Sequence, residues 1–313
     1  MPMETIMEQR SVDSDRWSAA DEETLAELGF YWRERDGVRV LVCGPLENAG
    51  FANGFSTRLG GVSSLEQAIV YPPATAGGSD SGQVDSGTEL NLAGFNEDTR
   101  ENIYENRRRF LSLFPREYRL ATAWQVHGDN IRVVREHGET GDSDERADAL
   151  VSNLDEVLLG VKTADCVPIL IGDPETGAFA AVHAGWRGTA QSIVKKAVAR
   201  LVEEFGSDPS DLVCAVGPAA GCDLYEVGQD VIDAFNENFS TGGKYFTETR
   251  PGHALVDLKA ANRDQLVDSG IQLKNVYIAP YCTMERADLF FSYRIEKKKF
   301  GRTGRLMSVI SKL

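Results

Sequence analysis

The sequence has few features of membrane or secreted proteins. Its 313 residues include no apolar run of about 18, the length of a membrane-crossing helix, so we expect no transmembrane span. The acidic N-terminal stretch MPMETIMEQRSVDSDRWSAADEE lacks the apolar core of a signal peptide, so we expect no secretion. The five cysteines are an odd number without tight spacing, which indicates reduced thiols. These absences together predict a cytoplasmic protein.

Positive charge is also scarce. The chain carries 33 Lys and Arg against 48 Asp and Glu, a formal net charge of -15. Such an acidic surface repels phosphate backbones, so we expect no nucleic acid partner. The hydrophobic share of 42% is enough for a sizeable buried core. We therefore expect a soluble globular protein.

Strands and helices are intermixed along the second half of the chain. Short apolar runs rich in β-branched residues predict strands at 156–163, 167–173, 178–184, 212–218 and 275–280. Helical spacing of apolar residues predicts helices at 190–205, 227–239 and 256–270, with Thr189 placed to cap the first. This mixture predicts an α/β or α+β fold in which sheets are covered by helices.

The first half of the chain contains an arm, a hairpin and a loop. Residues 1–29 indicate a flexible N-terminal arm with at most a short helix. Residues 30–46, FYWRERDGVRVLVCGPL, place Asp36-Gly37 between strand-like runs and predict a β-hairpin. Residues 71–89 are rich in Gly, Ser and Asp and predict a flexible loop. We expect one domain over residues 30–313, with this loop as an insertion.

Histidine is rare, with four in the chain, and two of them lie where strand-like runs end. His127 follows an apolar stretch in ATAWQVHGDNI, and His183 ends a predicted strand in AAVHAGWRGTA. Cys166 lies between two predicted strands in VKTADCVPIL. Two imidazoles and a thiolate suit Zn²⁺, with the fourth position left for water or substrate. The alternative is that Cys166 is an ordinary small buried side chain, and the spacing alone leaves both open.

Copper is the second metal that imidazole and thiolate ligands suit. A multicopper oxidase, however, holds several copper ions mainly with histidines, many more than the four in this chain. The sequence also contains no His-x-His pair. The number of ligands therefore argues against an oxidase of that class. The other two histidines, His137 and His253, lie in polar loops and are expected at the surface.

Two stretches have the chemistry of anion-binding sites. GFSTRLGGVS, residues 54–63, combines Arg58 with Gly60-Gly61, whose backbone N–H groups can approach a ligand closely. No Gly-Lys-Ser/Thr follows, so it is not a Walker A loop. GWRGTA places Arg187 just before a predicted helix, whose N-terminus attracts anions. The alternatives are a tight turn with an exposed Arg58, and an Arg187 paired with a nearby carboxylate.

A set of motifs in a fixed order identifies a family resemblance. The motifs are WQVHGDNI, DALVSN, KTADCVPIL, AAVHAGWRGT, VGPAAGCDLYEVG, CTMERADLFFSYR and TGRLMSVI. Together they resemble the YfiH-like family, also called the laccase-domain or multicopper polyphenol oxidase family, from about Gly54 to the C-terminus. The resemblance implies a single α/β sandwich domain with mixed sheets between helical layers. It also implies a zinc ion bound by His127, Cys166 and His183.

The resemblance further implies an enzyme that acts on purine nucleosides. Family members are described as cleaving adenosine, inosine and methylthioadenosine with phosphate, and as deaminating adenosine. Some relatives are assigned to peptidoglycan editing, so a hydrolase with Cys166 as nucleophile stays open. A nucleoside sensor without turnover is a third alternative. The chain departs from the family at Asn53, where members often have a histidine, and in its long 71–89 loop.

The residues also suggest roles for phosphorolysis. We expect Arg58 and the Gly60-Gly61 backbone to hold phosphate beside the ribose, with help from Arg187. Asp165 is the carboxylate next to Cys166 in sequence; it either protonates the leaving purine or only orients a metal ligand. We therefore expect Arg58, Asp165 and Cys166 as catalytic residues. Five further residues either belong to the core or line a pocket for a flat base. They are Tyr225, Phe290, Phe291, Tyr293 and Arg294.

Overall fold

The computed structural model describes residues 19–64, 89–94, 97–239 and 242–313. Most of the predicted arm and of the predicted loop 71–89 lies outside these residues. Helix α1 (Ala19–Glu27) occupies the end of the predicted arm and buries Leu25, which is 2% exposed. The fold therefore begins before residue 30. Within the described ranges, no helix is both long enough and apolar enough to cross a membrane.

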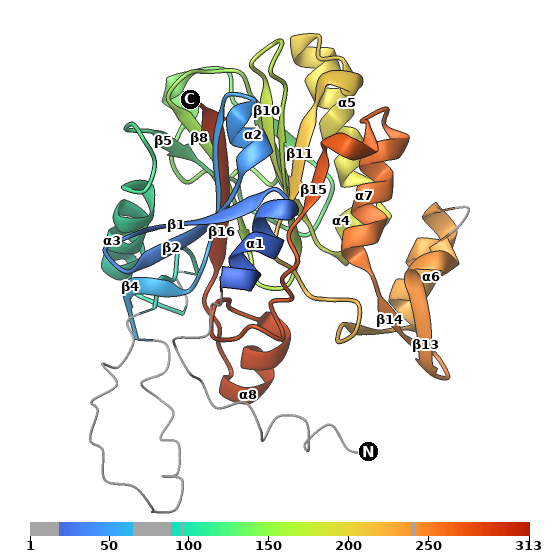
Figure 1. Cartoon of the computed structure of the whole chain (residues 1–313). Coiled ribbons are helices and arrows are strands. Elements are labelled where there is room, and N and C mark those ends of the chain that lie inside the picture. The colour runs from blue at the N-terminus through green and yellow to red at the C-terminus, as the bar shows by residue number, and fades with distance from the viewer. Residues whose placement is uncertain (1–18, 65–88, 95–96, 240–241) are drawn as a thin grey trace, which may run out of the picture.

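Two six-stranded mixed sheets form the centre of the molecule (Figure 1). The first sheet has the order β1 (Phe30–Arg35), β2 (Val38–Cys43), β3 (Phe51–Ser56), β16 (Leu306–Lys312), β8 (Val157–Thr163) and β5 (Arg119–Ala121). The second has the order β15 (Val276–Ile278), β11 (Val213–Val216), β9 (Val167–Gly172), β10 (Phe179–Ala184), β7 (Ala149–Ser152) and β6 (Ile131–Val133). The third, smaller sheet contains β12 (Glu226–Gly228), β14 (His253–Val256) and β13 (Phe246–Arg250), and β4 (Leu59–Ser63) is a separate short strand.

Helices cover the two outer faces of this pair of sheets. Helices α5 (Ile193–Phe205) and α7 (Leu258–Asp268) pack on the second sheet, and α3 (Arg100–Leu111) packs on the first, on the opposite side in Figure 1. The other α-helices of the described ranges are α2 (Gly44–Asn48), α4 (Trp186–Ala190), α6 (Gln229–Asn238) and α8 (Lys298–Phe300). This arrangement confirms the predicted fold of mixed sheets between helical layers.

The alternation of side chains along β10 shows how the core is divided between the layers. Phe179 and Ala181 belong to the cluster between the two sheets, whereas Ala180 and Val182 pack toward the helices. Because successive strand residues point to opposite faces, His183 continues the row of Phe179 and Ala181. The strand therefore directs this histidine toward the first sheet, although it belongs to the second. His183 is 2% exposed.

The chain crosses from one sheet to the other immediately before Cys166. Strand β8 belongs to the first sheet and β9 to the second, and only Ala164, Asp165 and Cys166 connect them. Asp165 makes this turn with φ 84°, in the left-handed region that costs a residue with a side chain roughly 1–2 kcal/mol. The crossing places Cys166 where the two sheets meet, on the side to which His183 points.

The predicted helix at 190–205 begins later than expected. The chain first forms the short α4, then Ser192 adopts a left-handed backbone with φ 59°, and α5 starts at Ile193. Thr189 therefore lies inside α4 rather than capping the next helix. Its buried hydroxyl accepts a hydrogen bond from the Asn262 amide at 3.0 Å, which ties the segment after His183 to α7.

Arg58 lies in a buried ion-pair network rather than in an open anion site. Its guanidinium bonds the carboxylates of Glu89 and Glu296 and donates to the Ala287 carbonyl at 2.8 Å. The same group lies 4.6 Å from the centre of the Phe291 ring. The Arg58 side chain is only 11% exposed. Because two carboxylates and a carbonyl already surround the cation, it does not present an open site for phosphate, contrary to the sequence-based expectation.

The Gly60-Gly61 pair serves close backbone packing in the same region. Gly60 has φ 83°, and a Cβ at Gly61 would overlap the backbone of Glu89. The carbonyls of both glycines accept hydrogen bonds from Arg109 Nη1, at 3.2 and 3.3 Å. Neither glycine lines the cleft described below, and Arg58 does not line it either. The predicted phosphate cradle is therefore not assembled from these three residues.

The Arg58 network predicts a large effect on stability. Replacing Arg58 with Ala leaves the carboxylates of Glu89 and Glu296 buried without their cation, and breaking a buried ion pair in this way costs about 3–5 kcal/mol. We expect urea unfolding to show that loss. The matched control is Arg250→Ala, which removes an exposed pair with Glu226 and should cost about 0–1 kcal/mol. Equal stability of the two variants would contradict a structural role for Arg58.

Candidate metal centre

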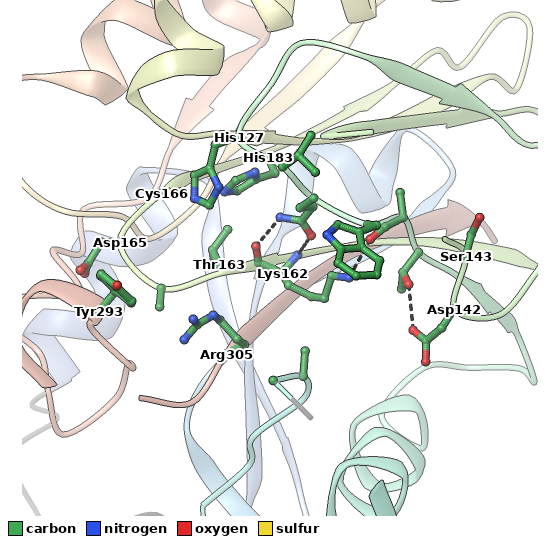
Figure 2. A pocket seen from close by; sticks show the side chains of 18 of the residues that line it. His127, Asp142, Ser143, Lys162, Thr163, Asp165, Cys166, His183, Tyr293 and Arg305 are labelled. Atoms are coloured by element: carbon green, nitrogen blue, oxygen red, sulfur yellow. Dashed lines mark hydrogen bonds between the residues drawn. The ribbon is translucent and has the colours of Figure 1, made fainter. Parts of the chain in front are cut away.

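The structure brings together the three residues that the sequence singled out. One ligand atom from each of His127, Cys166 and His183 lies within 4.8 Å of the others. The cysteine comes from the crossing between β8 and β9, His183 from β10, and His127 from the loop after β5. The two imidazole rings meet edge to face, with centroids 4.9 Å apart. Figure 2 shows the three side chains gathered at one wall of a cleft.

These residues fit a metal ion with three protein ligands. Two imidazole nitrogens and one sulfur form a donor set that suits zinc and leaves one position for another ligand. The adjacent Gly185 keeps the centre compact. A Cβ at Gly185 would lie 3.1 Å from Cδ2 of His127 and 3.2 Å from Sγ of Cys166, so a larger residue would displace the ligands. The cluster can therefore hold a metal ion, and the donor set favours zinc.

Asp148 orients both histidines. Its carboxylate is fully buried and accepts hydrogen bonds from the backbone N–H groups of Val126, His127 and Gly128 at 3.1, 2.9 and 2.8 Å. Nδ1 of His183 lies 2.8 Å from Oδ1 of the same carboxylate. Because the Asp148 carboxylate is an acceptor, Nδ1 of His183 carries the proton and donates it in this hydrogen bond. Nε2 of His183 then keeps a free lone pair with which it can bind a metal ion. Sequence reasoning gave Asp148 no role, although it is the first residue of the DALVSN motif.

Cys166 and His183 shift each other's pKa in opposite directions. Burial opposes the thiolate, but the charge of His183 and hydrogen bonds from both histidines outweigh it and lower the pKa of Cys166 to about 6. Burial likewise opposes the imidazolium, but the Cys166 charge and the Asp148 hydrogen bond raise the pKa of His183 to about 9. Without a metal ion, the pair is therefore a thiolate and an imidazolium near neutral pH.

The centre opens into a cleft of about 1650 Å³. Of the described residues, seven basic and three acidic ones line it, although the whole chain has a net charge of -15. The cleft is thus an electropositive region in an acidic protein, which favours an anionic ligand. The basic residues are Arg100, Arg107, Arg108, Lys162, Arg187, Arg294 and Arg305, and the acidic residues are Asp142, Asp144 and Asp165.

Asp165 ties the wall of the cleft to the crossing that carries Cys166. Its carboxylate accepts hydrogen bonds from Thr283 Oγ1 at 2.7 Å, Ser292 Oγ at 3.0 Å and the Arg294 backbone N–H at 2.7 Å. Burial raises the pKa of Asp165, while these donors act against that rise. Of the two roles left open by the sequence, this geometry favours positioning of the ligand turn over donation of a proton.

Other predicted residues divide between the cleft and the core. Arg187, Tyr225, Tyr293 and Arg294 line the cleft. Phe290 and Phe291 do not, because both are fully buried in the core. The sequence alone could not separate the two groups, because Phe290, Phe291 and Tyr293 are close neighbours in one segment and yet face the core or the cleft.

Asn53, which replaces the frequent family histidine, also has a structural role. Its side chain is fully buried and bonds the backbone N–H and carbonyl of Cys43, at 2.9 and 3.0 Å. These bonds join β3 to the end of β2. Asn53 does not line the cleft, so its substitution does not remove a group from the site.

The fold and the site define an α/β sandwich protein with a His-Cys-His centre in a cationic cleft. A family model described as multi-copper polyphenol oxidoreductase laccase matches residues 52–312, and the chain belongs to this family. The expected resemblance is thereby confirmed. Within the described residues there is one His-Cys-His cluster and no further group of metal-ligand type, in contrast to the several copper sites that the family description suggests.

Similar proteins are known from both sequence and structure. A purine nucleoside phosphorylase of Bacteroides thetaiotaomicron is 33% identical, over 77% of this chain and 91% of that protein. Adenosine deaminase RL5, from an unknown prokaryotic organism, is 36% identical over 57% of this chain and 71% of that protein. The crystal structure of YlmD from Geobacillus stearothermophilus has a TM-score of 0.75 and 33% identity, covering 91% of this chain and 98% of that one.

Asp148 predicts a measurable effect on metal binding. Replacing it with Asn keeps the side-chain volume but removes the charge that holds His127 and His183. We expect zinc affinity to fall roughly 10- to 100-fold, as for other residues that orient metal ligands. Competition titration with a chromophoric chelator measures this, with circular dichroism as a check of folding. Asp155→Asn, at an exposed ion pair with Lys312, is the control, and equal zinc affinity in both variants would contradict the role of Asp148.

The shifted pKa of Cys166 predicts selective alkylation of the metal-free protein. The thiolate is lost as the pH falls through about 6, and its imidazolium partner is lost as the pH rises through about 9. Iodoacetamide should therefore modify Cys166 with a midpoint near pH 6. Cys222, whose pKa is raised by burial and nearby carboxylates, should react only at higher pH than an ordinary thiol. Peptide mass spectrometry compares the two, and coinciding profiles would rule out the thiolate–imidazolium pair.

Proposed function

We propose that the chain is a zinc-dependent purine nucleoside phosphorylase in the cytoplasm. It would cleave adenosine, inosine or methylthioadenosine with phosphate, and deamination of adenosine would be a further activity. The observation that carries the proposal is a cluster of metal-ligand residues that faces a cationic cleft in a strongly acidic chain. The names of similar proteins in the same family support it. A single cluster of three ligand residues among the described residues gives no support to an oxidase that needs several copper ions.

Phosphate would bind to cations of the cleft that have no carboxylate partner. Arg187 is exposed and lies 4.2 Å over the ring of its neighbour Trp186, and no carboxylate of the described residues pairs with it. Among the described residues, the Arg305 guanidinium donates only to the carbonyls of Thr303 and Gly304, at 3.2 and 3.0 Å, from Nη1. A phosphate dianion would supply the acceptors that these guanidinium groups lack. The sequence-based hypothesis placed phosphate on Arg58 and Arg187. The present assignment retains Arg187 and substitutes Arg305 for Arg58.

Lys162 would add a third positive charge. Its amine donates to the Ala123 carbonyl at 2.8 Å, and burial lowers its pKa to about 8. The group is therefore mainly protonated at neutral pH and loses its charge as the pH rises through that value. Figure 2 shows Lys162 between the metal centre and Asp142, with Arg305 on the opposite side of the cleft from the centre.

These residues would promote phosphorolysis by placing and neutralising the nucleophile. A phosphate oxygen forms the new bond to the ribose C1′ as the glycosidic C–N bond breaks, and the electron pair of that bond and the proton of the hydrogen phosphate go to the departing base. The cations hold the phosphate in line and stabilise it beside the positive charge that develops on the ribose. A zinc ion, when bound, would supply Lewis-acid polarisation. Asp165 would keep the Cys166 turn in place.

A cysteine hydrolase is the second candidate, because the pKa of Cys166 is lowered to about 6. In that case Cys166 would be the nucleophile and His183 its proton acceptor. The two candidates differ in metal content. Elemental analysis of the purified protein, paired with adenosine turnover with and without phosphate, separates them. About one zinc per chain and adenine release only with phosphate support the phosphorylase. A metal-free, active protein inactivated by alkylation of Cys166 would overturn it.

The phosphate assignment predicts a selective defect in Arg187→Ala and Arg305→Ala. Hydrogen bonds to charged groups contribute about 1.5–3 kcal/mol, so KM for phosphate should rise roughly 10- to 100-fold in each variant. KM for the nucleoside should change much less. Arg250→Ala, outside the cleft, is the control. Steady-state kinetics at varied phosphate measures the effect, and unchanged KM for phosphate in both variants would move the phosphate site elsewhere.

A further inference from the structure

In the part of the chain that the structure describes, the strongly exposed aromatic side chains lie in the cleft. Among the described residues, the aromatic side chains with large exposure are Tyr104 (48%), Trp124 (58%) and Tyr293 (49%). All three line the cleft. Rings of this size are normally covered, because their burial stabilises the fold. Their collection in one cleft indicates a ligand with a flat apolar surface.

Trp124 differs from the other two in having no cation beside its ring. Arg305 lies 5.6 Å from the centre of the Tyr293 ring, and Arg107 lies 5.7 Å from that of Tyr104. Throughout the described chain, no cation and no second aromatic ring stacks on Trp124. The indole therefore presents a neutral face, which suits an uncharged group better than an anionic one.

The backbone beneath Trp124 is held rigidly. Its N–H donates to the Glu145 carbonyl at 2.9 Å, and its carbonyl accepts from the Ala147 N–H at 3.2 Å. The next residue, Gln125, makes two further bonds of 2.7 Å with the backbone N–H and carbonyl of Lys162 on β8. These bonds fix the backbone that carries the indole before any ligand arrives, so little backbone entropy would be lost on binding.

A second apolar side chain extends the same surface. Val126 is 41% exposed, lines the cleft and follows Trp124 by two residues. His127 comes next and belongs to the metal cluster. An apolar surface of Trp124 and Val126 therefore borders the His-Cys-His centre.

We propose that Trp124 and Val126 form the platform on which the purine base stacks. This proposal rests on the proposed function and names the part of the site that holds the base. Stacking uses the whole ring face and reads no hydrogen-bonding edge, so the platform accepts adenine and hypoxanthine alike. The smaller face of a pyrimidine gains less from it. Arg305, beside Tyr293, and Arg187 would bind the anionic phosphate, whereas the indole of Trp124, which has no cation beside it, would bind the neutral base.

The test compares Trp124→Ala and Trp124→Phe with wild type. Stacking of one base on an aromatic side chain corresponds to roughly 5- to 100-fold in affinity. We expect Trp124→Ala to raise KM for adenosine and for inosine by the same factor in that range, with kcat and KM for phosphate little changed. Trp124→Phe should recover most of the loss. Leu273→Ala, at a side chain 61% exposed and outside the cleft, is the matched control.

Calorimetry with adenine alone makes the result independent of turnover. Loss of adenine affinity in Trp124→Ala, with zinc content and circular dichroism preserved, supports the platform even where wild type shows no phosphorolysis. Wild-type KM and adenine affinity in Trp124→Ala would overturn it. So would a fall in kcat with KM unchanged, because a stacking platform acts on binding. Absence of adenine binding to the wild-type protein would overturn it as well.

Discussion

The buried carboxylate of Asp148 is the interaction on which the site depends. It accepts hydrogen bonds from three backbone N–H groups of the Val126–Gly128 turn and lies beside Nδ1 of His183, so one charge fixes two residues of the candidate metal cluster, which come from different parts of the chain. A fully buried carboxylate is tolerated only when donors surround it. The same donors that stabilise the charge therefore bring His127 and His183 into one position, with Cys166 supplied by the crossing between the sheets.

The molecule uses its arginines in two different ways, and burial distinguishes them. Arg58 is enclosed by Glu89 and Glu296 and joins distant segments of the fold. Arg187 and Arg305 open onto the cleft, and within the described ranges their side chains contact only neutral groups or aromatic faces. In a chain with a net charge of -15, cations without carboxylate partners are conspicuous, and their place beside the metal-ligand cluster supports an anionic co-substrate.

The predictions from sequence succeeded where a local pattern controls the structure. The strands around Cys166 and His183 appear as β8, β9 and β10, because runs of apolar β-branched residues favour buried strands whatever their partners. The same approach misplaced Arg58, and it left the Phe290-Phe291 pair open between the core and a pocket. Whether an arginine meets a carboxylate, or a phenylalanine meets the core, depends on segments more than a hundred residues away, such as Glu296 for Arg58.

The sequence by itself determined the chemistry of the ligand set, the strand that carries His183 and the family to which the chain belongs. These follow from residue type, local periodicity and motif order. Only the tertiary structure decided that Asp148 holds both histidines, that Asp165 bonds the segment containing Ser292, and that Trp124 stands uncovered in the cleft. The physical reason is that hydrogen-bond partners and exposure depend on which surfaces pack together. The packing of two sheets against each other is not encoded in any single segment of the sequence.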